Sequence, residues 1–148
     1  MFAVIENVFK YASSPDNVCL LISADADDTS IYNKAIIDRL KPYLEQYNIK
    51  IFFSPRKSKV DAFHRDIANI PDWDYLVPIT DFTEFCRQDY DLILHNYFST
   101  GVDIFKLVSA NMFGKDHHRL LAMNKSHYLK TGFIFNPQLV SNFTDALA

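Results

Sequence analysis

The sequence predicts an α/β fold with a mainly parallel central sheet and helices on both faces. Short uninterrupted apolar runs of strand length alternate with longer segments whose apolar residues repeat at helical spacing. The resulting order is helix, strand, helix, strand, helix, strand, helix, which is typical of parallel strands joined by right-handed crossovers. With 148 residues, 49% of them hydrophobic, the chain suits a single domain, residues 1–148.

The amino-terminal part contains the first two predicted strands. Apolar residues at helical spacing predict a helix over residues 2–11, followed by turn residues. The unbroken apolar run 18–23 predicts a strand that is covered on both faces. A second helix should begin near Ser30 and be kinked or divided at Pro42. The run 49–53 then predicts the second strand.

The remaining elements follow from capping residues and periodicity. Ser58 and Asp61 have capping-box-like spacing and open a predicted helix that extends to Ile70. A short buried strand is expected over 75–79, and an amphipathic helix over 89–98. Beyond Gly101 the sequence predicts strands over 102–108, 120–123 and 133–135, a loop over 111–116, and a short helix over 126–130 that is stopped at Gly132.

Composition and charge exclude several classes of protein. Fifteen Lys and Arg against eighteen Asp and Glu give a net charge of −3 without long runs of either sign, so no nucleic-acid-binding surface is predicted. No apolar segment is long enough to span a bilayer, and residues 1–6 lack the features of a signal peptide. Cys19 and Cys86 are interpreted as reduced thiols in or near the core. We therefore expect a cytoplasmic protein.

Acidic residues follow two of the predicted strands. Asp25, Asp27 and Asp28 come after the first strand, and Asp81 and Glu84 come after the third. Ligands in open α/β folds gather at the carboxyl ends of strands, so the loop with Asp81 and Glu84 is a candidate site for a metal ion or a phosphate-sugar. The structural alternative is that one or two of the first three acids favour a helix start, while Asp81 caps a turn and Glu84 is solvated.

Basic residues and histidines supply further candidates. Lys59 and Arg65 lie in the helix after the second strand, where they are either available to an anionic ligand or solvated. Asp116, His117 and His118 form a possible metal site, but without helical His spacing a polar loop is the simpler interpretation. With only three glycines, the chain has neither a P-loop nor a dinucleotide-binding fingerprint.

Four segments resemble, in order, the small family 2-like glycosyltransferases of the GT-A fold. They are LISADADDTS at residues 21–30, SKVDAFHRDI at 58–67, WDYLVPITD at 73–81 and GFIFNP at 132–137. Each motif is weak alone, and the resemblance rests on their sequential agreement over most of the chain. It implies a Rossmann-like architecture that binds a nucleotide-sugar.

The resemblance assigns roles to the polar residues. In that family the acids after the early strand bind the base and ribose, which corresponds here to Asp25, Asp27 or Asp28. The helix after the second strand lies against the nucleotide, so Lys59 and Arg65 would contact the donor phosphates.

The family's strand-end acidic motif holds a divalent cation that bridges the diphosphate, and Asp81 matches its first carboxylate. Mn²⁺ or Mg²⁺ in such a site stabilises the charge that develops on the leaving group. Phe82 replaces the usual second acid, and Glu84 is the candidate substitute.

Three further features depart from the family pattern. The family usually begins with a strand, whereas this sequence begins in a helix, so one wall of the nucleotide pocket is expected to be absent or supplied elsewhere. His64 stands where Asn is common. The segment that normally contributes the acceptor-side base has no good match, which leaves Asp145 as a weak candidate for the catalytic base.

Two functions from different classes are therefore predicted. The first is a metal-dependent glycosyltransferase that moves a sugar from a nucleoside-diphosphate sugar to an unknown acceptor. The alternative is a catalytically degenerate GT-A-like protein that acts as a binding or assembly subunit, either as a homo-oligomer or with a partner protein. A small metal-dependent hydrolase is a third hypothesis, and it requires His117 and His118 to meet Asp81.

Overall fold

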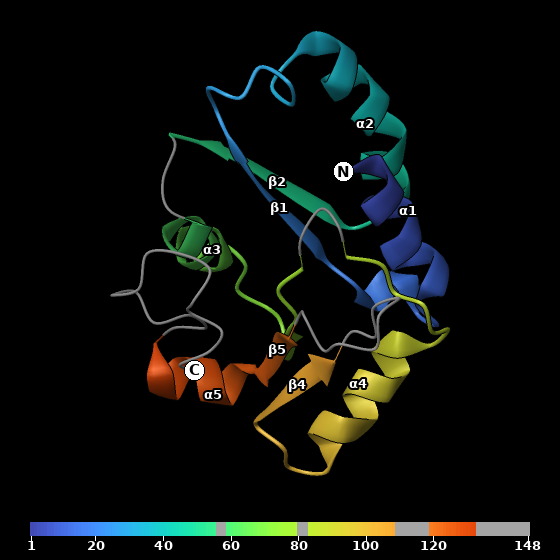
Figure 1. Cartoon of the computed structure of the whole chain (residues 1–148), viewed down its shortest axis with the longest axis vertical. Helices are drawn as coiled ribbons and strands as arrows, with labels where there is room; N and C mark the ends of the chain where they lie inside the picture. Colours follow the sequence, from blue (N-terminus) through green and yellow to red (C-terminus); the bar gives the residue numbers. More distant parts are fainter. Residues whose placement is uncertain (56–58, 80–82, 109–118, 133–148) are drawn as a thin grey trace.

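A computed structural model describes residues 1–55, 59–79, 83–108 and 119–132, and within them it has the expected α/β class (Figure 1). The elements are, in order, α1 (Phe2–Tyr11), the 3-10 helix η1 (Pro15–Asn17), β1 (Leu20–Asp25), α2 (Lys34–Gln46), β2 (Ile49–Ser54), α3 (Lys59–Ile67), β3 (Tyr75–Leu76), α4 (Tyr90–Ser99), β4 (Ile104–Val108), β5 (Arg119–Asn124) and α5 (Lys125–Thr131). No described helix combines the length and apolar character needed to cross a membrane.

The described strands form two sheets instead of the single, mainly parallel sheet that was expected. β1 and β2 are parallel, with Leu20 opposite Ile49 and Asp25 opposite Ser54. β3, β5 and β4 form an antiparallel sheet in which β5 is central. Only residues 109–118 separate β4 from β5, and a crossover to a parallel neighbour needs a longer connection. Length therefore favours antiparallel pairing of these two strands.

Most element predictions are confirmed, with shifted boundaries. The first helix has the predicted bounds, whereas α2 begins after Asn33 and continues undivided through Pro42. Pro42 lies on the exposed side of α2, where water can hydrate the carbonyl that loses its amide partner. The expectation that the first strand is covered on both faces is wrong, because Ser23 is exposed. The predicted strand 133–135 and loop 111–116 lie outside the described residues.

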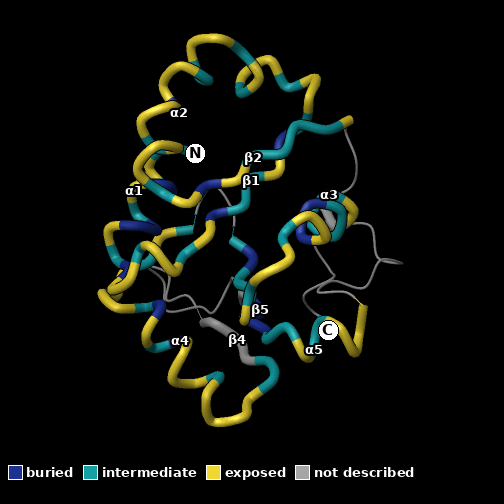
Figure 2. Tube along the Cα trace, turned by 180° about the vertical axis from the view of Figure 1, so that it is seen from behind, coloured by how far each residue is buried: buried dark blue, intermediate teal, exposed yellow. Residues whose placement is uncertain are grey.

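The core consists of two groups of apolar side chains. Figure 2 marks the buried positions along the Cα trace in dark blue. In the first group, residues at helical spacing on α1 pack against β1, β2 and α2, which follows from the amphipathic pattern. In the second, α3 packs against the antiparallel sheet. The buried members of the first are Ile5, Val8, Phe9, Leu20, Leu40 and Ile49, and those of the second are Ile67 and Met123.

Candidate functional site

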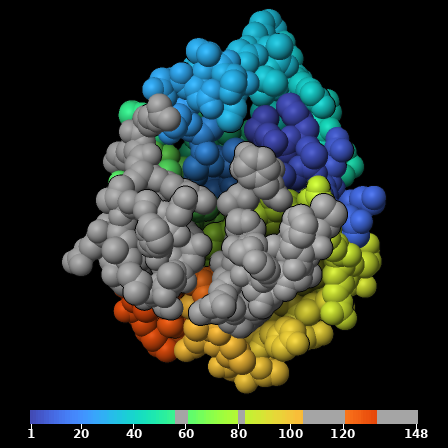
Figure 3. Space-filling model, in the orientation of Figure 1, coloured from blue at the N-terminus to red at the C-terminus, as the bar shows by residue number. Residues whose placement is uncertain are grey.

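The parallel pair ends in an acidic turn. Because β1 and β2 run in the same direction, Asp25 and Ser54 lie side by side at their carboxyl ends. The turn that leaves β1 forms part of one end of the molecule (light blue, Figures 1 and 3). Asp27 is exposed there, whereas Asp28 Oδ1 accepts hydrogen bonds from the Ser30 amide at 2.9 Å and its hydroxyl at 2.6 Å. Capping of the turn thus accounts for Asp28.

Asp25 and Arg65, two of the predicted ligand-binding residues, lie close enough to interact electrostatically. Helix α3 packs beside β1, which places Arg65 near the half-buried Asp25. The pKa of the Arg65 guanidinium is raised, first by its hydrogen bonds to Asp66 and additionally by the negative charge of Asp25. The carboxyl edge therefore combines acidic and basic groups.

The guanidinium of Arg65 also has a structural partner. Its Nε donates to Asp66 Oδ1 at 2.6 Å and its Nη2 donates to Asp66 Oδ2 at 2.8 Å, while Asp66 is only 1% exposed. Neighbouring residues on a helix do not normally face each other, so helical spacing gave no signal for this pair. These two bonds leave Nη1 able to donate to a ligand.

An aromatic pair at the same edge was missed by the sequence analysis. The rings of Tyr32 and Phe53 have centroids 4.8 Å apart and planes tilted by 49°. Phe53 lies near the carboxyl end of β2, and Tyr32 follows the acidic turn with 52% of its surface exposed. The only sequence signal was an aromatic residue close to each of two strand ends. An exposed aromatic ring that is held in place by contact with a second ring can stack on a nucleobase.

Asn33 holds the acidic turn against the start of α2. Its Oδ1 accepts a hydrogen bond from the Ile36 amide at 3.0 Å, which makes it the N-cap of α2. Its Nδ2 donates to the carbonyl oxygens of Thr29 at 2.8 Å and Ser30 at 3.3 Å. One side chain therefore fixes both the helix start and the turn.

We expect Asn33→Ala to reduce the free energy of unfolding by about 1 kcal/mol, because the cap is lost. Asn33→Asp keeps the cap acceptor but loses both donors to the turn, so most of the stability should remain. Urea denaturation of the two variants measures the difference. Equal destabilisation by both substitutions would show that the turn bonds, not the cap, carry the effect.

Of the remaining residues that were predicted to bind a ligand or a metal ion, the structure describes some and not others. Lys59 is the first residue of α3, whereas Asp81, Asp145 and the residues 116–118 lie outside the described residues. Glu84 is exposed, in a segment held to α1 by Asn7: Nδ2 donates to the Phe85 carbonyl at 3.1 Å, and the Phe85 amide donates to Oδ1 at 2.7 Å. Within the described ranges, no three His, Cys, Asp or Glu residues are grouped to hold a metal ion. The metal site stays a prediction.

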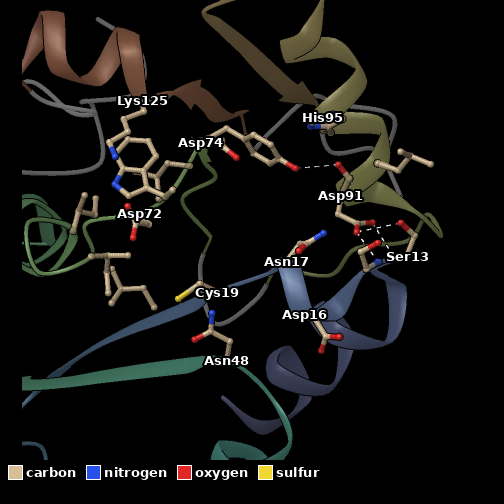
Figure 4. Close-up of a pocket in the computed structure, with 18 residues that line it drawn as sticks. Ser13, Asp16, Asn17, Cys19, Asn48, Asp72, Asp74, Asp91, His95 and Lys125 are labelled. Atoms are coloured by element: carbon tan, nitrogen blue, oxygen red, sulfur yellow. Dashed lines mark hydrogen bonds between the residues drawn. The ribbon is translucent and has the colours of Figure 1, made fainter.

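A cavity of about 750 Å³ lies at the opposite, amino-terminal ends of β1 and β2. Cys19 and Asn48, which precede the two strands, lie on one side of it, and Asp72, Asp74 and Lys125 lie on the other (Figure 4). Sequence reasoning did not predict this cavity, because it depends on how the two sheets meet.

The cysteine predictions need a correction. Cys19 and Cys86 are both free thiols, as expected, but both are exposed instead of lying in or near the core. Cys19 precedes the first residue of β1 and lines the cavity. Although this thiol reaches solvent, partial desolvation raises its pKa, opposed by the charge of Lys50. It is therefore a weak nucleophile at neutral pH.

Comparisons of the chain with protein-family models, curated proteins and solved structures found no match. A functional assignment therefore rests on the chemistry of the carboxyl edge and the cavity.

Proposed function

We propose that the chain binds a nucleoside-diphosphate sugar at the carboxyl ends of β1 and β2 and transfers the sugar to an acceptor, as a metal-dependent glycosyltransferase of the GT-A type. The observation that carries this proposal is the exposed Tyr32 ring, supported by Phe53, beside the acidic turn that follows β1. A stacking surface next to carboxylates suits a nucleoside, which offers a flat base and hydroxyl donors.

The base, the ribose and the diphosphate of the donor each have a matching group at this edge. The base stacks on Tyr32, and the carboxylates of Asp25 and Asp27 accept hydrogen bonds from ribose hydroxyls or base N–H groups. The first turn of α3, which begins at Lys59, offers backbone amides to the diphosphate. Nη1 of Arg65 adds a charged donor.

The divalent cation is proposed from the resemblance and from the two predicted ligands, Asp81 and Glu84. Carboxylate oxygens are the ligands that Mg²⁺ and Mn²⁺ prefer. When bound, such an ion stabilises the negative charge that the nucleoside diphosphate acquires on leaving.

A second candidate is a nucleotide-sugar-binding or assembly subunit without transfer activity. Two contacts favour it. Arg65 donates two hydrogen bonds to Asp66, so part of its charge is already compensated. Glu84 belongs to a segment that Asn7 ties to α1, which restricts how it can approach a ligand at the carboxyl edge.

Nucleotide binding tests the first proposal. Calorimetric and thermal-shift titrations with UDP, GDP and CDP, each with and without Mn²⁺, should show that one nucleotide stabilises the protein in a metal-dependent manner. Asp81→Asn should abolish the dependence on Mn²⁺. Tyr32→Ala should weaken binding about tenfold through lost stacking. Tyr97→Ala, which removes an exposed tyrosine on α4, is the matched control and should change nothing.

The outcomes separate the candidates. No binding of any nucleotide at millimolar concentration would reject the carboxyl edge as a donor site. Metal-independent binding that Asp81→Asn leaves unchanged, together with no release of nucleoside diphosphate from the matching nucleotide-sugar, would favour the subunit without transfer activity.

A further inference from the structure

Two strand edges that are unpaired among the described strands border the same cavity. Among the described strands, β1 pairs only with β2, and β3 pairs only with β5, so each is the edge of its sheet. The cavity of about 750 Å³ is lined by Leu21 of β1 and by Tyr75 and Leu76 of β3. The edge of β1 at Leu21 and the edge of β3 at Tyr75 and Leu76 therefore border one cavity.

The backbone of β1 can pair on the cavity side. The Leu20 amide donates to the Asn48 carbonyl at 3.0 Å, so Leu20 directs its backbone groups toward β2. Successive residues of a paired parallel strand alternate in direction, so Leu21 and Ser23 direct theirs to the opposite edge. Within the described ranges, the backbone groups of these two residues form no hydrogen bond on that side.

The same reasoning applies to β3. The Lys125 amide donates to the Asp74 carbonyl at 2.8 Å, so Asp74 directs its carbonyl toward β5. Tyr75, the next residue, directs its backbone groups to the other edge, where the cavity lies. An edge with unpaired amides and carbonyls is a template for another strand.

The walls of the cavity favour a strand with apolar side chains at alternate positions. Apolar side chains come from Leu21, Ile67, Ile70 and Leu76, and the indole of Trp73 adds an aromatic surface. These groups suit alternate apolar side chains of an extended peptide.

The charges around the cavity favour a basic strand. Asp16, Asp72 and Asp74 line it, and none of them forms an ion pair within the described ranges. Asp91 instead accepts hydrogen bonds from Ser13 and Ser14. Among the described residues that line the cavity, the one Lys or Arg is Lys125, whose Nζ donates to the Pro71 carbonyl at 2.6 Å. The exposed carboxylates therefore outnumber this lysine and would attract Lys or Arg.

We propose that an extended segment of a partner protein, with alternating apolar side chains and at least one Lys or Arg, inserts between β1 and β3. It pairs with both edges and joins the two sheets in the order β2, β1, partner strand, β3, β5, β4. The cavity borders β1 at Leu21, so the partner strand enters beside Leu21, and a strand of five or six residues, about 17–20 Å long, matches the six residues of β1. The insertion does not depend on the nucleotide-sugar proposal.

A synthetic peptide tests this insertion on the whole chain. The probe is acetyl-KVTVTVTVK-amide, which combines alternating valines with terminal lysines. Trp73 is the single tryptophan and lines the cavity, so peptide binding should shift its fluorescence to shorter wavelength. Cys19 also lines the cavity, and its alkylation by a maleimide should slow about tenfold at a peptide concentration near ten times Kd. Cys86, the other free thiol, does not line the cavity and should react at an unchanged rate.

Matched controls separate backbone pairing from non-specific binding. The same peptide with N-methyl groups on every valine and threonine keeps its side chains and charge but loses its amide donors to both edges, and it should not protect Cys19. The double variant Asp72→Asn/Asp74→Asn should bind the probe about tenfold more weakly, with reduced salt dependence, because two attracting charges are gone. Glu45→Gln, an exposed change on α2, should bind normally.

Three results would overturn the proposal. Unprotected Cys19 and unchanged Trp73 fluorescence at millimolar peptide would reject strand insertion. Equal binding of the N-methylated peptide would reject edge pairing, and equal binding of a peptide with terminal Glu would reject the charge argument. Protection of Cys19 that rises with protein concentration, without peptide, would show that a second copy of the chain occupies the cavity instead.

Discussion

Replacing Asp91 with alanine is expected to lower the free energy of unfolding by about 2–3 kcal/mol, because three hydrogen bonds to a buried carboxylate are lost. Asp91 lies in the first turn of α4 and is 8% exposed. Its Oδ1 accepts from the Ser13 amide at 2.8 Å, and its Oδ2 accepts from the Ser14 amide at 2.9 Å and the Ser13 hydroxyl at 3.2 Å (Figure 4). This carboxylate joins α4 to the segment after α1, so its removal affects the whole fold.

The contribution of Asp91 should depend on pH. Burial raises the pKa of this carboxyl, but hydrogen bonds from the Ser13 and Ser14 amides lower it more, so the net pKa lies below the ordinary 3.8. A carboxyl whose pKa is lower in the folded state stabilises the protein above its unfolded pKa. That stability is lost as the pH falls through the folded pKa. The stability difference between wild type and Asp91→Asn should therefore shrink below about pH 4.

Asp89 provides the matched control two residues away. It is exposed, and its backbone is in the left-handed region with φ of 61°, a conformation that asparagine tolerates. Asp89→Asn removes the same charge near the same helix end and should change stability little. Chemical denaturation at pH 7 and pH 3.5 compares the variants. If Asp89→Asn and Asp91→Asn behaved alike, net charge rather than the bonds to Ser13 and Ser14 would explain the effect.

The sequence predicted the local elements well because their information is local. The apolar positions Ile5, Val8 and Phe9 lie on one face of any helix that contains them, and Ser13 with Pro15 ends that helix. The helix α1 therefore has its predicted bounds. The runs that became β1 and β2 were recognised for the same reason, and their parallel pairing followed from the helix between them.

Features that depend on tertiary contacts could not be predicted. Asp91 appeared only as an acid on an amphipathic helix, and its burial depends on Ser13, which lies 78 residues away. Cys19 was expected near the core because it lies in an apolar run, yet it faces a cavity between the two sheets. Hydrophobic periodicity gives the type of an element but not how one sheet approaches another.

The candidate site was predicted only in part, because some of its features are local in sequence and others depend on tertiary contacts. The sequence alone placed acids at the carboxyl end of β1, the resemblance put the helix with Lys59 and Arg65 against the same ligand, and the structure brings Asp25 and Arg65 together. The support of Tyr32 by Phe53 was missed, since it depends on how the turn after β1 folds over the end of β2. The pairing of Arg65 with its neighbour Asp66 was missed as well, because helical spacing does not predict it.

Arg65→Met is expected to reduce the free energy of unfolding by about 3 kcal/mol, because it leaves the carboxylate of Asp66 buried without its cation. Asp66 is 1% exposed and accepts both hydrogen bonds of the guanidinium. The double variant Arg65→Met/Asp66→Leu removes the buried charge and should recover most of the loss. Urea denaturation of the single and double variants measures the coupling.

A surface ion pair provides the control for the Arg65 and Asp66 variants. Lys34 pairs with Asp38 on α2, where the lysine side chain is 88% exposed, so Lys34→Met should cause no measurable change. If Arg65→Met were equally harmless, water would have to reach Asp66 and the buried-charge argument would fail. If the double variant were as unstable as Arg65→Met, lost packing would be the cause instead of the unpaired carboxylate.

The double variant also separates the structural role of Arg65 from its proposed role in donor binding, since it should fold without offering a cation to the donor. If Nη1 contacts the diphosphate, losing this charge-assisted hydrogen bond should weaken nucleotide binding about tenfold in a protein of nearly normal stability. Unchanged binding would assign Arg65 to the fold alone and leave the phosphates to the amides at the start of α3. Measuring stability and nucleotide affinity on the same variant therefore distinguishes loss of a ligand contact from loss of structure.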